Sequence, residues 1–256
     1  LAFIANVTLK TIPDPPEKGT GLLLFNSPES AGNFVPLFKS MGASAIEFLD
    51  DESLRTAQHF EKPPYDPNSV KDDVTGLLIE YQDNSKNEID RLIEESIEFS
   101  EKESSVISIK LVTEKQDRET IWRIRKALYP TIGSLRKTGT SIITEDIAVD
   151  AENLAQAIRG LKKIFRKREF TDGVIFGHAK DGNLHFITSV DLDDKNGARN
   201  YEGMMRDLSD MTLTQFNGSL KAEHGTGRNM AAFVEAEWGG PLYERRREGK
   251  NLTDPW

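Results

Sequence analysis

The chain has 256 residues, a formal net charge of −9 and no cysteine. Hydrophobic residues make up 37% and charged residues 29% of it, which is typical of a globular protein. The acidic balance argues against a nucleic-acid binder, which needs clustered Lys and Arg. The lack of cysteine excludes disulfides, thiolate metal ligands and an iron–sulfur cluster held by this chain. No apolar run approaches the roughly 20 residues of a membrane-spanning helix.

Short apolar strands and longer amphipathic helices are expected to alternate along the chain. The expected strands cover residues 19–25, 44–49, 74–82, 105–112, 141–149, 173–178 and 184–190. The expected helices cover 28–42, about 85–103, a segment around Trp122, a segment after Asp150, and about 198–216. Ser27 and Asp150 are the predicted N-caps of their helices, and Pro36 predicts a kink or an early helix end.

This order of elements favours an α+β fold: an antiparallel sheet with helices packed on one side, built as two ferredoxin-like halves. A doubly wound parallel sheet is disfavoured, because no Gly-x-Gly-x-x-Gly stands between a strand and a helix and no Walker-type loop is present.

The stretch VIFGHAKDGNLHFI, residues 174–187, is predicted to form a β-hairpin with two histidines. An Asp-Gly pair between apolar strands favours a type I′ turn, because this turn needs positive φ at both central residues. With Asp181 and Gly182 as the loop, His178 stands directly opposite His185. Their Cβ atoms would then be ~4.5–5.5 Å apart on one face, close enough to share a metal or a substrate.

A third histidine and a carboxylate occur together in KAEHGTGRN, where Glu223 precedes His224. Two histidines and one carboxylate are a common ligand set for a catalytic zinc-type ion with an open position. Two alternatives stay open: histidines that satisfy buried backbone carbonyls, and Glu223 paired with Arg228. His59 lies outside both motifs, where a surface or packing role is favoured.

FGHAKDGNLHF and AEHGTGRNMAAFVEAEWG, in this order, resemble the paired signatures of the FAD-linked oxidase C-terminal domain. This family belongs to flavoenzymes that oxidise D-2-hydroxy acids of the D-lactate, glycolate or D-2-hydroxyglutarate type. The second motif is most similar to the long subgroup that carries an iron–sulfur module after this domain. The resemblance implies an FAD-dependent dehydrogenase that transfers hydride from the hydroxy acid to the flavin.

The resemblance also implies roles for particular residues. His178, His185 and Glu223 would bind a divalent metal, with zinc the expected ion, and His224 would be the catalytic base. Asn183 and Arg125 would bind the substrate, Arg125 by gripping its carboxylate. Arg125 could equally form an exposed salt bridge on its helix. Glu145 and Asp146 are candidates to orient a histidine, and strand parity alone does not choose between them.

The family binds FAD through a separate domain that this sequence does not contain. Together with the absence of an initiator Met, this predicts that residues 1–256 are the substrate- and metal-binding fragment of a longer polypeptide. FAD would be bound mainly by the missing domain, and an iron–sulfur cluster would belong to the full-length protein only. The expected location is the cytoplasm, with peripheral association at the inner face of the membrane as a variant. The alternatives are a non-catalytic metal-binding scaffold and a zinc-dependent hydrolase.

Overall fold

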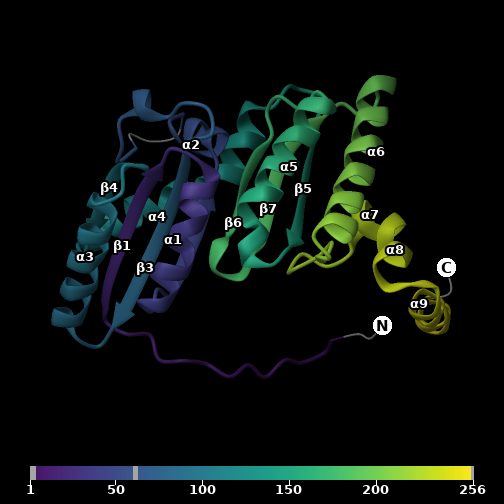
Figure 1. Cartoon of the computed structure of the whole chain (residues 1–256). Helices are drawn as coiled ribbons and strands as arrows, with labels where there is room; N and C mark the ends of the chain where they lie inside the picture. Colours follow the sequence, from purple (N-terminus) through teal and green to yellow (C-terminus); the bar gives the residue numbers. More distant parts are fainter. Residues whose placement is uncertain (1–3, 60–62, 255–256) are drawn as a thin grey trace.

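The computed structural model describes residues 4–59 and 63–254, and its centre is a seven-stranded sheet of order β4-β1-β3-β2-β6-β7-β5 (Figure 1). Every strand pair in it is antiparallel. The strands are β1 (Glu17–Phe25), β2 (Ala45–Leu49), β3 (Thr75–Asp83), β4 (Val106–Val112), β5 (Ser141–Ala148), β6 (Val174–His178) and β7 (Asn183–Val190). The predicted α+β class and antiparallel sheet are confirmed.

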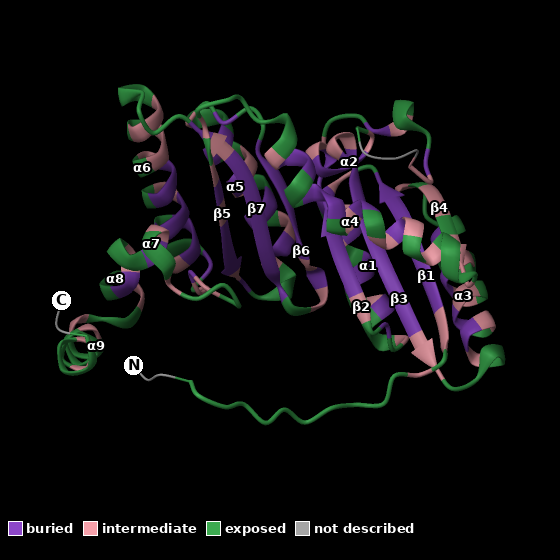
Figure 2. Cartoon of the chain, turned by 180° about the vertical axis from the view of Figure 1, so that it is seen from behind, coloured by how far each residue is buried: buried purple, intermediate pink, exposed green. Residues whose placement is uncertain are grey.

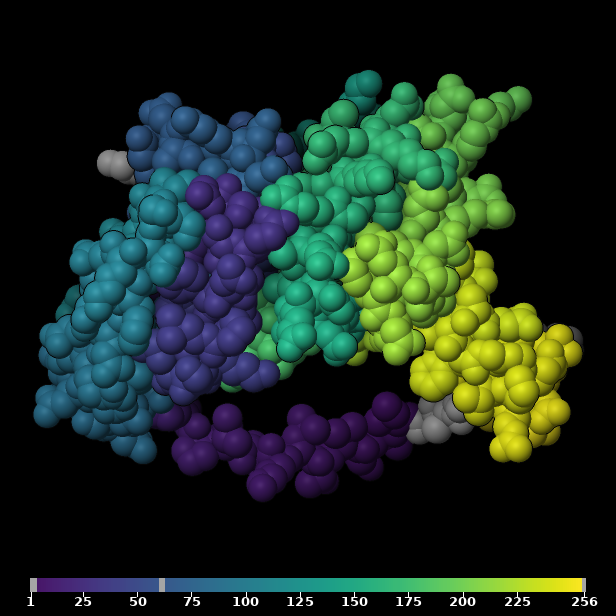
Figure 3. Space-filling model, viewed as in Figure 1, coloured from purple at the N-terminus to yellow at the C-terminus, as the bar shows by residue number. Residues whose placement is uncertain are grey.

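Helices connect these strands and continue beyond the sheet. They are α1 (Pro28–Ser40), α2 (Asp51–Ala57), α3 (Lys86–Glu101), α4 (Lys115–Leu135), α5 (Leu154–Lys167), α6 (Lys195–Asp210), α7 (Gly227–Met230), α8 (Val234–Trp238) and α9 (Gly240–Thr253). Residues 4–14 are an exposed extended segment that runs clear of the sheet (Figure 3), and α9 lies beyond α8 at the periphery of the molecule (Figure 1). The body that carries the sheet is therefore residues 17 to about 238.

The sheet divides into two ferredoxin-like halves that meet where β2 pairs with β6. In the first half, the order β4-β1-β3-β2 with crossover helices α1 and α3 is the βαββαβ arrangement. The second half repeats it with β5, α5, β6, β7 and α6. Its fourth strand is reduced to a single bridge between Ala148 and Ser219. After Ser219 the chain forms no further strand pairing among the described residues, and the motif that contains Glu223 and His224 follows directly.

The prediction that helices pack on one side of the sheet is wrong, because both faces of the sheet are apolar and helices cover both. Helices α1, α3, α5 and α6 pack on one face, around residues such as Leu23, Ile79 and Phe186. The shorter α2 and the long α4 pack on the opposite face, around Leu22 and Leu78. Figure 2 shows the buried strands between these layers. The polar residues described below lie on this second face, in the same strands as Leu49, Phe176 and Ile187.

Two local predictions fail at helix starts and interiors. Ser27 caps α1 as predicted, since its Oγ accepts the N–H of Ser30 at 3.1 Å. However, α1 continues past Pro36 to Ser40, so the early end is wrong, and the alternative of a kink at Pro36 stays a prediction. Asp150 makes no side-chain cap, because a short 3₁₀ turn (Ala151–Asn153) precedes α5. The backbone carbonyl of Asp150 accepts the N–H of Asn153 instead.

The buried N-cap of α2 gives the fold a pH dependence. Asp50 is 1% exposed, its Oδ1 accepts the N–H of Ser53 at 2.8 Å, and its Oδ2 has no partner among the described residues. Burial raises the pKa of Asp50 to about 7. Between the ordinary carboxyl pKa and pH 7 the folded chain therefore binds a proton that the unfolded chain has lost. The free energy of unfolding is expected to fall as pH rises through this window, and to level off above it.

Asp50→Asn is expected to abolish this fall in the free energy of unfolding with rising pH, because Asn caps helices as well as Asp and carries no charge. Urea unfolding at pH 5 and pH 8 measures it: the variant should be more stable than the wild type at pH 8 by on the order of 2–4 kcal/mol. Asp66→Asn, at the exposed cap of a 3₁₀ turn, is the matched control and should change little. Equal stability of Asp50→Asn and the wild type at pH 8 would contradict the prediction.

Candidate functional site

The hairpin that carries the two histidines forms with a longer connection than predicted. Phe176, not His178, pairs with His185, so the predicted register is wrong by two residues. The connection is a 3₁₀ turn (Ala179–Asp181) followed by Gly182 at φ 69°. Glycine is required at position 182 for two reasons: the positive φ disfavours other residues, and a Cβ would overlap the carbonyl oxygen of Val149.

The two histidines nevertheless face the same side of the sheet. Side chains alternate between faces with a period of two, so a shift of two residues preserves the face. The ring centroids of His178 and His185 are 5.2 Å apart, with the ring planes at 90°. His178 is half-buried, whereas His185 is 2% exposed. The prediction that the two rings lie close together is therefore confirmed.

Glu223 brings one carboxylate oxygen between the two imidazoles. Its Oε1 lies 3.2 Å from Nε2 of His178 and 3.0 Å from Nε2 of His185. Nitrogen and oxygen donors of these three residues lie within 4.8 Å of one another. Two imidazoles and a carboxylate are suitable ligands for zinc and similar divalent ions, so the chemistry of this donor set fits such an ion. The two histidines, rather than Arg228, are the partners of Glu223 here.

Glu47 of β2 is a member of the site that sequence reasoning missed. It is 5% exposed and stands directly opposite His178 in the β2–β6 register. Its Oε1 lies 2.6 Å from Nδ1 of His178, and its Oε2 accepts a hydrogen bond from Nε of Arg125 at 2.9 Å. A carboxylate on Nδ1 fixes the ring so that Nε2 points to Glu223. The one sequence signal was an acidic residue inside the apolar strand SAIEFL.

The two histidines have opposite pKa shifts. The hydrogen bond with Glu47 raises the pKa of His178, and the neighbouring carboxylate charges act in the same direction. Burial lowers the pKa of His185 to about 4, and the positive charge of Arg125 contributes. His185 is therefore a neutral imidazole near pH 7, the form that ligates metals. His178 must lose its more firmly held proton before it can ligate an ion.

Arg125 reaches the site from α4, so it is not an exposed salt bridge within its own helix. Its side chain is 17% exposed, pairs with Glu47, and stacks over the ring of Phe176 with Cζ 4.2 Å from the centroid. Nε donates to Glu47, and no hydrogen bond from its terminal Nη groups to another described residue is present. A guanidinium held in this way can offer these groups to a carboxylate.

The remaining residues of the two histidine motifs have different surroundings. The exposed ring of His224 stacks on His185, with centroids 4.8 Å apart and planes at 15°. Asn183 is 5% exposed, and its Nδ2 donates to the carbonyl of Ile147 at 3.1 Å. Lys180 donates to the carbonyl of Ala43 at 2.8 Å, so its ammonium ties the hairpin tip to the start of β2. The substrate-binding role of Asn183 stays a prediction.

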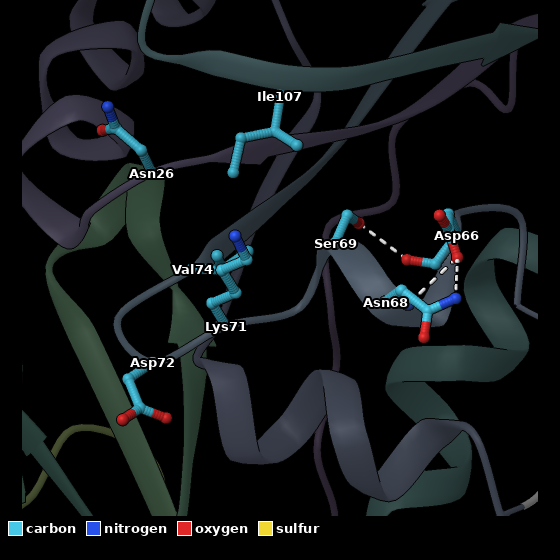
Figure 4. Close-up of a pocket in the computed structure, with 8 residues that line it drawn as sticks. All are labelled: Asn26, Asp66, Asn68, Ser69, Lys71, Asp72, Val74 and Ile107. Atoms are coloured by element: carbon cyan, nitrogen blue, oxygen red, sulfur yellow. Dashed lines mark hydrogen bonds between the residues drawn. The ribbon is translucent and has the colours of Figure 1, made fainter.

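A separate surface hollow lies by the end of β1 and the edge strand β4 (Figure 4). It is lined by Asn26, Asp66, Asn68, Ser69, Lys71, Asp72, Val74 and Ile107. Several of its polar groups already bond one another within a 3₁₀ turn: Asp66 accepts from the backbone and side chain of Asn68. None of the predicted site residues lines it. We find no chemistry there comparable to the histidine cluster.

No helix among the described residues is both long and apolar enough to cross a membrane. The fold and the site together define the class of the chain: an α+β domain with a candidate divalent-metal centre where its two ferredoxin-like halves meet.

The chain belongs to the family of FAD linked oxidases, C-terminal domain, whose model matches residues 14–256. The family resemblance seen in the sequence is thereby confirmed. Among curated proteins, the chain is 26% identical to D-lactate dehydrogenase of Anaerostipes hadrus, over 100% of this chain and 54% of that protein. It is 25% identical to glycolate oxidase subunit GlcD of Bacillus subtilis, over 92% of this chain and 48% of that protein.

A third relative is longer. D-2-hydroxyglutarate dehydrogenase of Haemophilus influenzae is 26% identical over 100% of this chain and 26% of that protein. The chain thus spans half or less of these relatives, apart from the slightly larger share of the first. Among solved structures, 4-ethylphenol oxidase from Gulosibacter chungangensis shares the fold, with a TM-score of 0.63 at 13% identity over 95% of this chain and 53% of that one.

Proposed function

We propose that this chain is the substrate- and metal-binding part of an FAD-dependent dehydrogenase that oxidises a D-2-hydroxy acid to the 2-oxo acid. The observation that carries the proposal is the convergence of His178, His185 and Glu223, with one carboxylate oxygen 3.2 and 3.0 Å from the two Nε2 atoms. The relatives named for D-lactate, glycolate and D-2-hydroxyglutarate chemistry support the substrate class.

These three residues would hold a divalent ion, for which zinc is the expected choice. When bound, such an ion lowers the pKa of a substrate hydroxyl and orients it. Glu47 holds the ring of His178 through Nδ1, and this leaves Nε2 facing Glu223. The proposed ligands come from strands β6 and β7 and from the loop after the Ala148–Ser219 bridge, and Glu47 of β2 supports them from the first half of the fold.

Oxidation of a 2-hydroxy acid requires removal of the hydroxyl proton while hydride leaves C2 for the flavin. His224 is exposed beside the cluster and is the residue that we assign as the base. Arg125 is assigned to the substrate carboxylate, because its guanidinium is fixed by Glu47 and Phe176. Asn183 is assigned as a further substrate contact, with its Oδ1 lacking a partner among the described residues.

The flavin would be bound mainly by a separate domain of the same polypeptide, as the partial coverage of the relatives suggests. The site would then lie at a domain interface, which is a common location for small-molecule sites. Membership of the long subgroup with an iron–sulfur module stays a prediction, and this chain has no cysteine to ligate such a cluster.

Two measurements test the proposal. Elemental analysis of the purified chain after incubation with zinc should give about one ion per chain, held by His178, His185 and Glu223. Anaerobic mixing of the full-length flavoprotein with D-lactate, glycolate or D-2-hydroxyglutarate should bleach the flavin with at least one of them. L-lactate is the control and should react far more slowly. Zinc binding without any flavin reduction would favour the scaffold alternative, and absence of zinc would refute the metal assignment.

A further inference from the structure

Asp146 is a wholly buried acid at the edge of the site. It lies on β5 with 0% exposure and stands directly opposite His185 in the β5–β7 register. Its neighbour Glu145 pairs with Phe186 instead and therefore points to the other face of the sheet. The register makes the choice between these two carboxylates that the sequence left open. A buried acid needs hydrogen-bond donors around it, and the donors to Asp146 indicate its structural role.

One oxygen of Asp146 fixes the loop that presents the third ligand and the base. Oδ2 accepts the backbone N–H of Ala222 at 2.9 Å, of Glu223 at 2.6 Å and of His224 at 3.3 Å. This loop follows the isolated bridge between Ala148 and Ser219 and has no strand ladder of its own. Three N–H groups on one carboxylate oxygen therefore replace the missing fourth strand as the support of the loop.

Oδ1 of Asp146 and Nδ1 of His185 are each buried, and neither has a hydrogen-bond partner among the described residues. A carboxylate oxygen of Asp146 and a ring nitrogen of His185 lie within 4.8 Å of each other. On the opposite edge of the ring, Nε2 of His185 is 3.0 Å from Glu223. A histidine that ligates through Nε2 carries a proton on Nδ1, which requires an acceptor.

The geometry disfavours a second metal ion held by Asp146, His185 and His224, although their donor atoms are near one another. The lone pair of an imidazole nitrogen lies in the plane of the ring. The rings of His185 and His224 are stacked at 15° with centroids 4.8 Å apart, so one ion cannot lie in both planes. Glu223 already meets His185 from the other edge.

We infer that Asp146 is a positioning residue with two tasks, an inference that rests on the proposed metal site. Through Oδ2 it clamps the loop that carries Glu223 and His224. Its Oδ1, which makes no hydrogen bond to the other described residues, would accept the Nδ1 proton of His185 when Nε2 ligates the ion, and would so hold Nε2 toward Glu223. Asp146 would thus serve His185 as Glu47 serves His178: each hairpin histidine has a buried acid directly opposite it on the neighbouring strand.

Two substitutions separate these tasks. In Asp146→Asn the amide oxygen still accepts the loop N–H groups, but the amide NH₂ cannot accept a proton from Nδ1. We expect the affinity of the chain for zinc, measured by chelator competition, to fall roughly 10–100-fold. Amide hydrogen exchange of residues 222–224 should stay slow. Asp146→Ala should weaken zinc binding and also accelerate this exchange. Glu145→Gln, on the same strand but the other face, should change zinc affinity by less than about three-fold.

A second readout follows the proton itself. In the zinc-loaded wild-type chain, NMR should show a slowly exchanging, downfield Nδ1 proton of His185, and Asp146→Asn should lose it. Wild-type zinc affinity in Asp146→Asn would overturn the inference, as would unchanged amide exchange in Asp146→Ala. Two zinc ions in the wild type and one in Asp146→Asn would instead identify Asp146 as a ligand. Failure of the wild type to bind zinc would refute the proposed metal site, which is a different outcome from all of these.

Discussion

His224→Ala is expected to slow flavin reduction by the D-2-hydroxy acid ~10²–10⁴-fold, the range for loss of a general base. His224 is exposed and its ring stacks on His185, whereas the Glu223 carboxylate contacts His178 and His185 directly. The substitution should therefore remove the base and leave the three metal ligands in place. Stopped-flow measurement of flavin bleaching in the full-length protein gives the rate, and elemental analysis gives the metal content.

His59→Ala is the matched control for this experiment, because His59 is also exposed but lies at the end of α2, outside both motifs. It should reduce the flavin at the wild-type rate. Two results for His224→Ala would contradict the assignment. An unchanged rate would mean that another group takes the proton. Loss of metal together with activity would mean that His224 is a ligand rather than the base.

The parts of the site that could be predicted are those written in short stretches of sequence. The hairpin requires only an Asp-Gly turn between apolar strands, and Glu223 and His224 are adjacent residues. The predicted turn type was wrong, but side chains alternate between the two faces of a sheet, and this alternation correctly placed His178 and His185 on the same face. The ferredoxin-like halves follow similarly from the alternation of strands and helices.

The parts of the site that could not be predicted depend on strand pairings between segments far apart in the sequence. Glu47 meets His178 only because β2 joins β6 at the junction of the halves, a pairing that no local pattern specifies. Asp146 was separated from Glu145 only by the register of β5 against β7. Both acids sit in apolar strands, where a buried charge is costly unless it is paired. An acidic residue inside an otherwise apolar predicted strand therefore indicates a buried, paired carboxylate.

The three-ligand site makes its strongest prediction at Glu223. Glu223→Gln is expected to lower the affinity of the chain for zinc by roughly 100-fold or more, a larger loss than removal of a supporting carboxylate. The carboxylate supplies the one anionic donor of the set, and its Oε1 is the atom that both Nε2 atoms approach. Chelator competition measures the affinity, and Glu235→Gln, on the nearby α8, is the control without a predicted effect.

Stability separates the loss of a ligand from the loss of a structural contact. The Glu223 side chain is 52% exposed, so without metal the substitution should change the free energy of unfolding by no more than about 0.5 kcal/mol. Zinc at about 100 times its dissociation constant should stabilise the wild type by about 2.7 kcal/mol. At the same zinc concentration the variant should gain little.

If the variant were stabilised by zinc as much as the wild type, His178, His185 and Glu223 would not be the metal site. If it were strongly destabilised without zinc, the contacts of Glu223 with the two histidines would be structural rather than those of a ligand set.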